Sequence, residues 1–204
     1  MAKPLLYNGQ IYHVYNRGVD KRKIFLNLND HQRFSDSLIV FNNTENLNGN
    51  RFADLLKCDE RTTLVNIIAY CLMPNHFHLL LEQITDDGVA KFIQKMATSY
   101  TMYFNKKYQR NGALLQGTFK RSHIQSNSRL LEMSKYIHYN PYKILCTNDD
   151  PTIDTKKLLL QYPWSSFPDY ANLRTESKII SNSKIILDQF DSPEHYVKYV
   201  LGLT

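Results

Sequence analysis

Two histidines separated by one residue, His76 and His78, are the first side chains whose types and spacing could do chemistry. On a β-strand, residues two apart point to the same face, so the two imidazoles would lie side by side. Neighbouring imidazoles are suitable ligands for a divalent metal ion. The pair alone is weak evidence, because a chain with 7 histidines in 204 residues contains roughly 0.24 such pairs by chance.

A tyrosine and an asparagine four residues apart, Tyr136 and Asn140, form a second candidate group. On a helix, this spacing places both side chains on one face. A phenol is a poor nucleophile at neutral pH, but a metal ion that polarises a target phosphate makes its attack easier. Asn140 could then complete the shell of that metal. Without further context, such a pair is more often a tyrosine packed on the core and an asparagine that caps the helix.

The predicted elements would bring these groups together. Alternating apolar residues predict a strand at residues 10–17, and apolar residues at three- and four-residue steps predict helices at residues 29–46 and 89–108. Residues 64–72 and 76–83 are apolar runs that form a predicted hairpin, and residues 114–125 form a last strand. The polar residues 45–61 predict a loop with a short strand or turn. This order is that of the α+β, ferredoxin-like (split βαβ) fold, an antiparallel sheet with helices on one face.

One more helix is expected after the last strand, at residues 128–140, and it would carry Tyr136 and Asn140. Asn127 or Ser128 is suited to cap this helix, and Pro141 should end it, because the residue before a proline avoids helical geometry. We divide the chain into a main domain at residues 1–145 and a C-terminal extension packed on it at residues 146–204. In the extension, residues 162–168 predict an irregular docking segment and residues 193–201 a helix.

The distribution of charge points to nucleic acid. The net charge is +6, and residues 88–131 contain no Asp or Glu. A region of one sign attracts phosphate, although ordinary solubility explains any single surface cation. The candidate nucleic-acid contacts are Arg17, Lys106, Lys107, Arg110, Lys120, Arg121 and His123. The aromatic residues Tyr100, Tyr103 and Phe104 fall on the apolar stripe of their helix, so we expect them in the core and not stacked on bases.

Several classes of protein are disfavoured by the composition. Cys58, Cys71 and Cys146 are far apart and odd in number, which indicates free thiols and not a disulfide framework or a zinc site. The chain has no apolar run of about 18 residues and no start of the signal-peptide type, so no membrane association is expected. A cytoplasmic location follows as the expectation.

Five ordered blocks of the sequence resemble the single-tyrosine HUH transposases, and among these they resemble most the REP-associated tyrosine transposases. The blocks are Y-H-V-Y-N-R-G at 12–18, M-P-N-H-F-H-L-L-L at 73–81, L-L-Q-G-T-F-K at 114–120, Y-I-H-Y-N-P at 136–141 and Y-P-W-S-S-F at 162–167. The resemblance implies that His76 and His78 bind Mg²⁺ or Mn²⁺, that Tyr136 is the nucleophile and that Asn140, where some relatives have Gln, is a third ligand.

The reaction that the resemblance implies is a transesterification of single-stranded DNA at hairpin or repeat ends. The tyrosine attacks a phosphodiester, forms a 5′-phosphotyrosine link and frees a 3′-hydroxyl, and a second 3′-hydroxyl later reverses the step. Neither water nor a nucleotide cofactor is consumed. Tyr139 is the rival nucleophile, but the spacing to Asn140 favours Tyr136.

Other functions remain open at this point. A non-catalytic single-stranded nucleic-acid-binding module of RRM-like fold would share the predicted architecture and leave His76, His78 and Tyr136 without a chemical role. A replication initiator or relaxase would share the chemistry but usually has a longer chain, and a domesticated enzyme would keep the chemistry without moving an element. The sequence leaves open whether the protein is a monomer or a homodimer, whether Tyr136 acts in cis or in trans, and which DNA sequence is the target.

Overall fold

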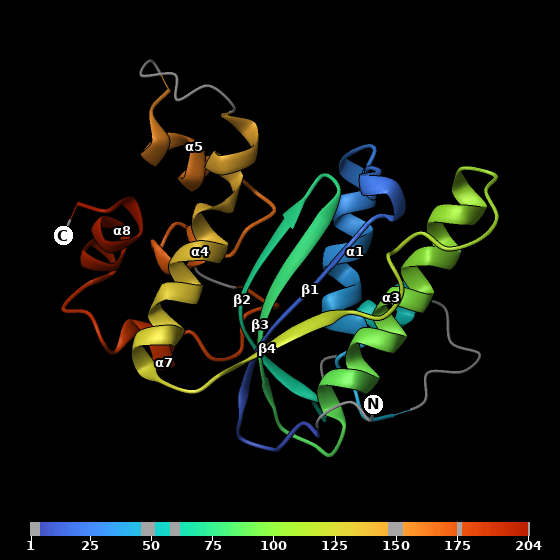
Figure 1. Cartoon of the computed structure of the whole chain (residues 1–204), viewed down its shortest axis with the longest axis horizontal. Coiled ribbons are helices and arrows are strands. Elements are labelled where there is room, and N and C mark those ends of the chain that lie inside the picture. The colour runs from blue at the N-terminus through green and yellow to red at the C-terminus, as the bar shows by residue number, and fades with distance from the viewer. Residues whose placement is uncertain (1–4, 46–51, 58–61, 147–152, 175–176, 204) are drawn as a thin grey trace.

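The computed structural model describes residues 5–45, 52–57, 62–146, 153–174 and 177–203. At its centre is an antiparallel sheet in the order β2-β3-β1-β4. The strands are β1 (Ile11–Arg17), β2 (Val65–Met73), β3 (His76–Gln83) and β4 (Lys120–Ile124). The helices α1 (Leu28–Val40) and α3 (Gly88–Lys107) cover one face, and α4 (Asn127–Leu145) covers the other (Figure 1). The predicted ferredoxin-like α+β class is therefore confirmed.

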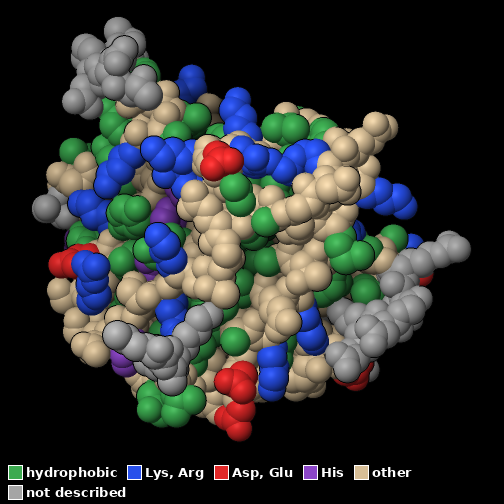
Figure 2. All heavy atoms as spheres, turned by 45° about the vertical axis from the view of Figure 1, so that its right-hand side comes forward, with side chains coloured by type: hydrophobic (Ala, Val, Ile, Leu, Met, Phe, Trp, Pro, Cys, Tyr) green, Lys and Arg blue, Asp and Glu red, His purple; other side chains and the backbone are tan. Residues whose placement is uncertain are grey.

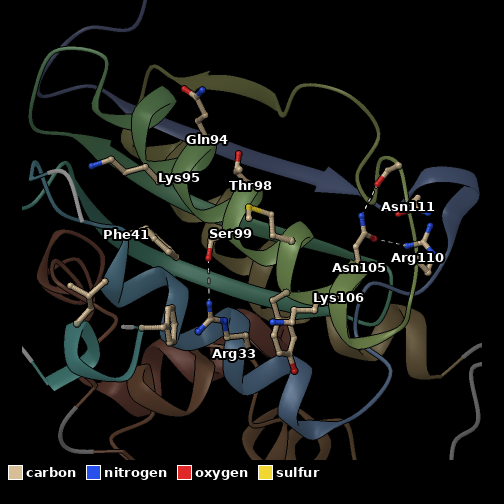
Figure 3. Close-up of a pocket in the computed structure, with 15 residues that line it drawn as sticks. Arg33, Phe41, Gln94, Lys95, Thr98, Ser99, Asn105, Lys106, Arg110 and Asn111 are labelled. Atoms are coloured by element: carbon tan, nitrogen blue, oxygen red, sulfur yellow. Dashed lines mark hydrogen bonds between the residues drawn. The ribbon is translucent and has the colours of Figure 1, made fainter. Parts of the chain in front are cut away.

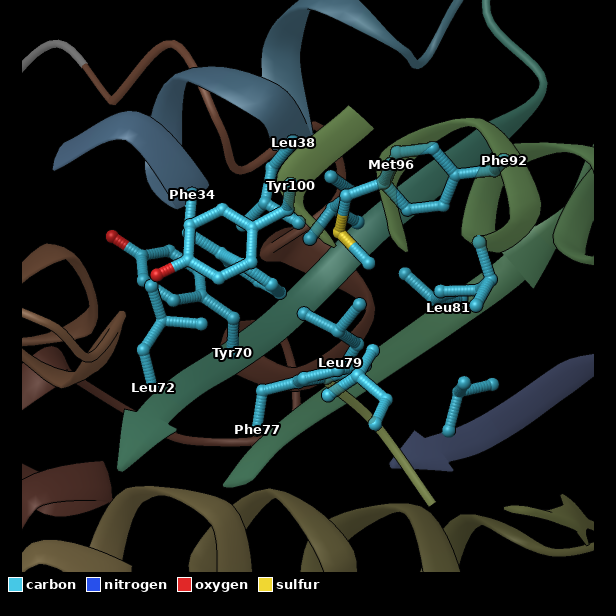
Figure 4. Packing of buried hydrophobic residues seen from close by; sticks show 14 of the residues in the cluster. Phe34, Leu38, Tyr70, Leu72, Phe77, Leu79, Leu81, Phe92, Met96 and Tyr100 are labelled. Atoms are coloured by element: carbon cyan, nitrogen blue, oxygen red, sulfur yellow. The ribbon is translucent and has the colours of Figure 1, made fainter. Parts of the chain in front are cut away.

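The face under α1 and α3 holds a hydrophobic core. Successive strand residues point to opposite faces, so Val14 of β1 and Phe77 and Leu79 of β3 all point to this side. Phe34 of α1 and Tyr100 of α3 pack onto them, and all five side chains are fully buried (Figure 4). Tyr100 also donates a hydrogen bond to the carbonyl oxygen of Ile24 at 2.5 Å. The expectation that the aromatic residues of this helix are core residues is confirmed for Tyr100 and Phe104, while Tyr103 is half-buried at the edge.

The other face is covered by α4 together with the helices that follow it. These are α5 (Thr155–Gln161), α6 (Phe167–Tyr170), α7 (Lys184–Leu187) and α8 (Pro193–Leu201). Leu80 of β3 and Ile137 of α4 belong to a second buried cluster that also contains Phe167, Tyr170 and Tyr196 from the later helices. The helix α4 is thus packed between its own sheet and the C-terminal segment (Figure 1).

The predicted docking segment at residues 162–168 lies along the outer edge of β2. The backbone N–H of Leu72 donates to the carbonyl oxygen of Trp164 at 2.8 Å, and the N–H of Ser166 donates to that of Tyr70 at 3.0 Å. Ser165 forms an isolated antiparallel bridge with Cys71. These bonds satisfy backbone groups at the edge of the sheet that would otherwise be open to another strand.

A buried histidine fixes α4 to this segment. The ring of His138 is fully buried, with Nδ1 2.6 Å from the hydroxyl of Tyr196 in α8 and Nε2 2.7 Å from Oγ of Ser166. Burial lowers the pKa of His138 to about 3, so the ring is neutral. The contact ties the middle of α4 to two parts of the chain that come later in the sequence.

The predicted end of α4 was wrong. The helix continues through Pro141 to Leu145, and it begins after Ser126, whose side chain accepts a hydrogen bond from the N–H of Arg129. Pro141 is buried, so the packing of this turn compensates for the backbone hydrogen bond that a proline cannot donate. The prediction used only the local tendency of residue 140, which precedes a proline, to avoid helical geometry. Tertiary contacts outweigh that tendency here.

Other element boundaries also differ from the prediction. The last strand is only β4, because residues 114–119 cross over irregularly, with Gly117 at a φ of +59°. The first helix ends at Val40 and begins after Asn27, which accepts from the N–H of Asp30. Several short helices were not predicted. They are the 3₁₀ turn η1 (Val19–Lys21), α2 (Phe52–Lys57), which lies within the stretch where a strand or turn was expected, and α5, α6 and α7 of the C-terminal extension.

None of the described helices has the length and apolar character needed to cross a membrane. Cys71 and Cys146 are buried free thiols, as predicted. Cys58 lies outside the described residues.

Candidate active site

The side chains of His76 and His78 lie on the α4 face of the sheet, while Phe77 between them points into the opposite core. In the register with β1, Arg17 lies opposite His76 and Tyr15 opposite His78. The prediction that the two imidazoles share one face of a strand is therefore confirmed. Their ring centroids are 4.9 Å apart.

The turn before β3 orients His76. The side-chain amide nitrogen of Asn75 donates to the carbonyl oxygen of Lys21 at 3.1 Å, so its Oδ1 faces the other way, toward His76. The Nδ1 of His76 lies 2.7 Å from that oxygen. Because an amide oxygen can only accept, Nδ1 carries the hydrogen, and the lone pair of His76 is left on Nε2. This contact was not predicted, because residue 75 lies between the two predicted strands of the hairpin and nothing local to it indicates a partner.

His78 has a third histidine as its neighbour. The Nε2 of His13, in β1, lies 2.8 Å from the Nδ1 of His78, and both side chains are buried. In the strand predicted at residues 10–17, the period of two puts His13 on one face with Ile11 and Tyr15, but it does not connect this face with that of His78. The register between the two strands supplies that connection.

The helix α4 brings Tyr136 and Asn140 to the same place. The ring of Tyr136 meets the His78 ring edge-on at a centroid distance of 5.4 Å, and its side chain is 38% exposed. Asn140, one turn later, is buried, and its side chain is near enough to His76 to affect the pKa of that ring. Tyr139 instead packs against Tyr142, at a ring distance of 5.2 Å, and against the hydrophobic cluster on that side.

The histidines of the site are neutral. Burial lowers the pKa of His76 to about 4, assisted by the charge of Arg17 and opposed by the nearby side chain of Asn140. Burial also lowers the pKa of His78 to about 2 and that of His13 to about 4. A neutral imidazole keeps the lone pair that a metal ligand needs.

The residues of the site fit a divalent metal ion. Both histidines have Nδ1 engaged and Nε2 available, and the amide nitrogen of Asn140 is buried without a partner. Rotating that amide by half a turn would present its oxygen at the same position. Among the described residues, no group of three or more His, Cys, Asp or Glu side chains is arranged to hold a metal. An ion at His76 and His78 would therefore need the amide or water as further ligands.

Two hollows flank Tyr136 and give access to the site. One, of about 280 Å³, is lined by Arg17, Lys120 and His76 among others. The other, of about 380 Å³, is lined by His13, Ser122 and Arg129 among others. His78 and Tyr136 belong to the walls of both hollows. An extended polymer could therefore occupy both hollows and run past Tyr136 between them.

The basic residues predicted to contact DNA are divided between the two faces. Arg17 and Lys120 line the hollow beside Tyr136. Arg121 and His123 alternate with Lys120 along β4 and lie opposite Val14 and Tyr12, whose side chains belong to the other face. His123 is also within 2.8 Å of Oε1 of Gln10 and stacks on Tyr12.

The remaining predicted cations lie at the far side, on or just after α3. Lys107 forms an ion pair of 2.6 Å with the buried Asp30. Lys106 and Arg110 line a groove of about 1110 Å³ among α1, α2 and α3, remote from Tyr136 (Figure 3). Lys and Arg side chains cross the upper part of the face in Figure 2, with acidic side chains rare among them. The basic residues therefore cover more of the surface than the region around Tyr136.

Comparisons with known proteins agree with this architecture. A family model described as IS200-like transposase matches residues 40–140, about half of the chain, from the end of α1 to Asn140. The fold is similar to a solved structure of a REP-associated tyrosine transposase bound to a REP hairpin, with a TM-score of 0.57 and 13% sequence identity. The match covers 89% of this chain and 90% of the other. No curated protein matches the sequence.

Proposed function

Because the chain belongs to the family of IS200-like transposases, we propose that it cleaves and rejoins single-stranded DNA through a covalent link to Tyr136. The observation that carries the proposal is the meeting of Tyr136 with His78, and of Asn140 with His76, from a helix and a strand far apart in the sequence. We assign the chemistry to the domain of residues 1–145. The C-terminal extension would act by holding α4 in place, through the contacts of His138 with Ser166 and Tyr196.

A Mg²⁺ or Mn²⁺ ion held by His76, His78 and Asn140 would polarise the scissile phosphate and stabilise the charge that develops on it. The hydroxyl oxygen of Tyr136 attacks the phosphorus and forms a 5′-phosphotyrosine, while the bond to the 3′-oxygen breaks and that oxygen takes up a proton. In the second step, another 3′-hydroxyl attacks the phosphotyrosine, and Tyr136 recovers its proton. Each step exchanges one phosphoester bond for another, so neither water nor a nucleotide is consumed.

The surroundings of Tyr136 support its role as the nucleophile. Its partial exposure lets a strand reach it, and its edge-on contact with His78 holds the ring beside the candidate ligands. Arg17 and Lys120 in the adjoining hollow can bind phosphates on one side of the scissile bond. The neighbouring tyrosine, Tyr139, is packed in the hydrophobic cluster and does not line either hollow.

We further propose that the substrate is single-stranded DNA at hairpin-forming repeat ends, as in the REP-associated branch. This rests on the similar fold of a REP-associated transposase that was solved with a REP hairpin, and on the five sequence blocks shared with that branch. The RRM-like binding module is disfavoured because such modules bind bases on an open sheet face. Here α1 and α3 cover one face and α4 covers the other.

The test is to trap the covalent intermediate. The purified protein is incubated with Mn²⁺ and a labelled DNA hairpin with single-stranded flanks, taken from the inverted repeats nearest to its gene, and adducts are separated on a denaturing gel. We expect an adduct with the wild type and with Tyr139→Phe, and none with Tyr136→Phe. An adduct that survives Tyr136→Phe and is lost with Tyr139→Phe would assign the nucleophile to Tyr139.

A further inference from the structure

His13 lies in the middle of the site, yet no step of the proposed reaction uses it. It is on the central strand β1, paired with β3 on one side and β4 on the other, and its side chain is only 5% exposed. The ring stacks on Tyr15 at a centroid distance of 5.0 Å and meets Tyr136 edge-on at 6.1 Å. A polar side chain buried at this position needs a reason.

The contact between His13 and His78 restricts which atom of His78 can bind a metal. Only one hydrogen fits between two nitrogens 2.8 Å apart. If His13 holds that hydrogen, the remaining hydrogen of a neutral His78 is on Nε2, which then has no lone pair for a metal. If His78 holds it on Nδ1, Nε2 is free to bind. The metal-binding form of His78 therefore requires that His13 accept.

We propose that His13 is a positioning residue: its Nε2 accepts the hydrogen of His78 Nδ1 and so presents His78 Nε2 to the metal ion. This inference rests on the proposed function, because it concerns the same metal site. A hydrogen-bond partner behind a ligating histidine also holds the plane of the ring and strengthens the ligand. The stacking with Tyr15 and the pairing of β1 on both sides keep His13 itself in place.

The other candidate ligand is held in the same way by a different group. Asn75 accepts the hydrogen of His76 Nδ1, as His13 does for His78, and in both cases Nε2 is left for the metal. The two supporting residues come from different parts of the chain, a turn and the central strand. A role in packing alone would explain the burial of His13 but not a short contact made nitrogen to nitrogen.

The experiment measures Mn²⁺ binding without DNA, by electron paramagnetic resonance of the free ion during titration. We expect His13→Phe, which keeps a ring but removes the acceptor, to weaken Mn²⁺ binding about 10- to 100-fold. His13→Gln, whose amide oxygen reaches the same position, should recover part of the affinity. The matched control is His195→Phe, which removes a half-exposed histidine of α8 that pairs with Asp191 and contacts the ring of Phe190.

Equal affinities of His13→Phe and the wild type would overturn the inference. If His13→Phe does not fold, as judged by circular dichroism, His13→Met and His13→Gln replace it, and equal binding by these two would overturn the inference in the same way. Wild-type binding that is insensitive to both His76→Ala and His78→Ala would instead refute the proposed metal site, and with it this role of His13. If Mn²⁺ binding depends on His76 and His78 but is unchanged by substitution of His13, the inference about His13 fails and the proposed function stands.

Discussion

Side chains of β1 and β3 that point toward α1 and α3, such as Val14 and Phe77, are apolar and sealed from solvent. Toward α4, the same two strands present His13, His76 and His78, which adjoin two open hollows, beside Leu80, which packs in the second hydrophobic cluster. Successive residues of one strand therefore serve opposite purposes. Under the proposed function, the first face contributes stability alone, and the second contributes both packing and the reactive side chains.

The polar groups on the α4 face can be buried because they have hydrogen-bond partners. Each imidazole engages one nitrogen with Asn75 or with the neighbouring histidine, and α4 is fastened by His138. The unpartnered amide nitrogen of Asn140 stands out against this pattern. A buried polar atom without a partner costs free energy, which a bound ligand at that position would recover.

The largest effect we expect is on activity, from His76→Ala. Loss of one ligand should lower the rate of adduct formation about 10³-fold, since a bound metal contributes several kcal/mol to the stability of such a transition state. The free energy of unfolding should change by less than about 1 kcal/mol, because this side chain is only partly buried. Single-turnover cleavage and urea denaturation measure the two quantities. If His76→Ala lowered the free energy of unfolding by several kcal/mol, the loss of activity would reflect unfolding, and the contrast between the two faces would be wrong.

The neighbouring substitution, Phe77→Ala, should do the reverse. Phe77 is fully buried between the sheet and Phe34, so its truncation leaves a cavity and should cost about 3–5 kcal/mol. The midpoint of urea denaturation measures this cost. Without denaturant, and at a temperature at which the variant is folded, its cleavage rate should stay within a few-fold of that of the wild type. A small change in stability would show that the apolar face is less important than its burial indicates.

The third prediction concerns Asp30, the one charged side chain at the edge of the apolar face that is fully buried in the described structure. Burial raises its pKa, but hydrogen bonds from Lys107, Tyr108, Tyr103 and the N–H of Leu26 outweigh this and lower it. Asp30→Asn should cost about 1–3 kcal/mol at neutral pH, because it removes a hydrogen-bonded charge from a buried position.

The sign of the pH dependence follows from that lowered pKa. The stabilisation from Asp30 is fully present above the pKa of an unfolded aspartate, about 4, and it is lost as the pH falls through the lower folded value. The difference in unfolding free energy between the wild type and Asp30→Asn should therefore shrink on acidification below pH of about 4. A difference that grows in acid would mean that burial dominates the pKa.

The smallest effect is expected from surface charge. Lys120→Glu, beside Tyr136, should weaken binding of a single-stranded oligonucleotide several-fold and reduce the slope of log affinity against log salt by about 1. Lys106→Glu, in the groove remote from the tyrosine, is the matched control and should change both quantities less. Fluorescence anisotropy over a range of salt concentrations compares them. Equal effects would extend the DNA surface to both sides of the molecule.

The sequence predicted best those features that follow from local alternation. The strand β3 has the predicted bounds, and the face shared by His76 and His78 follows from the same period of two. The fold class followed from the order of the elements, and the i, i+4 spacing of Tyr136 and Asn140 was sufficient to place both on one side of α4. The helix beyond Pro141 was not predicted, because burial of its turn is a tertiary effect.

Contacts between residues far apart in the chain could not be predicted from the sequence. The partner of His13 is 65 positions away, and only the register between β1 and β3 brings it to His78. Lys107 was grouped with the DNA contacts because of its charge, but its ion pair with Asp30 is visible only once α1 and α3 are packed. A surplus of positive charge in the sequence does not distinguish a cation that binds phosphate from one that neutralises a buried carboxylate.

The fastening of α4 by Tyr196 also bears on the order in which the protein is made. The chain leaves the ribosome from its N-terminus, so the three histidines and Tyr136 emerge before the segments that hold α4 against the sheet. A nascent chain that has not yet reached Tyr196 carries every reactive side chain but lacks one of the contacts that orient the tyrosine. Under the proposed function, the capacity to cut DNA would consequently arise only after the segment that contains Tyr196 has been made.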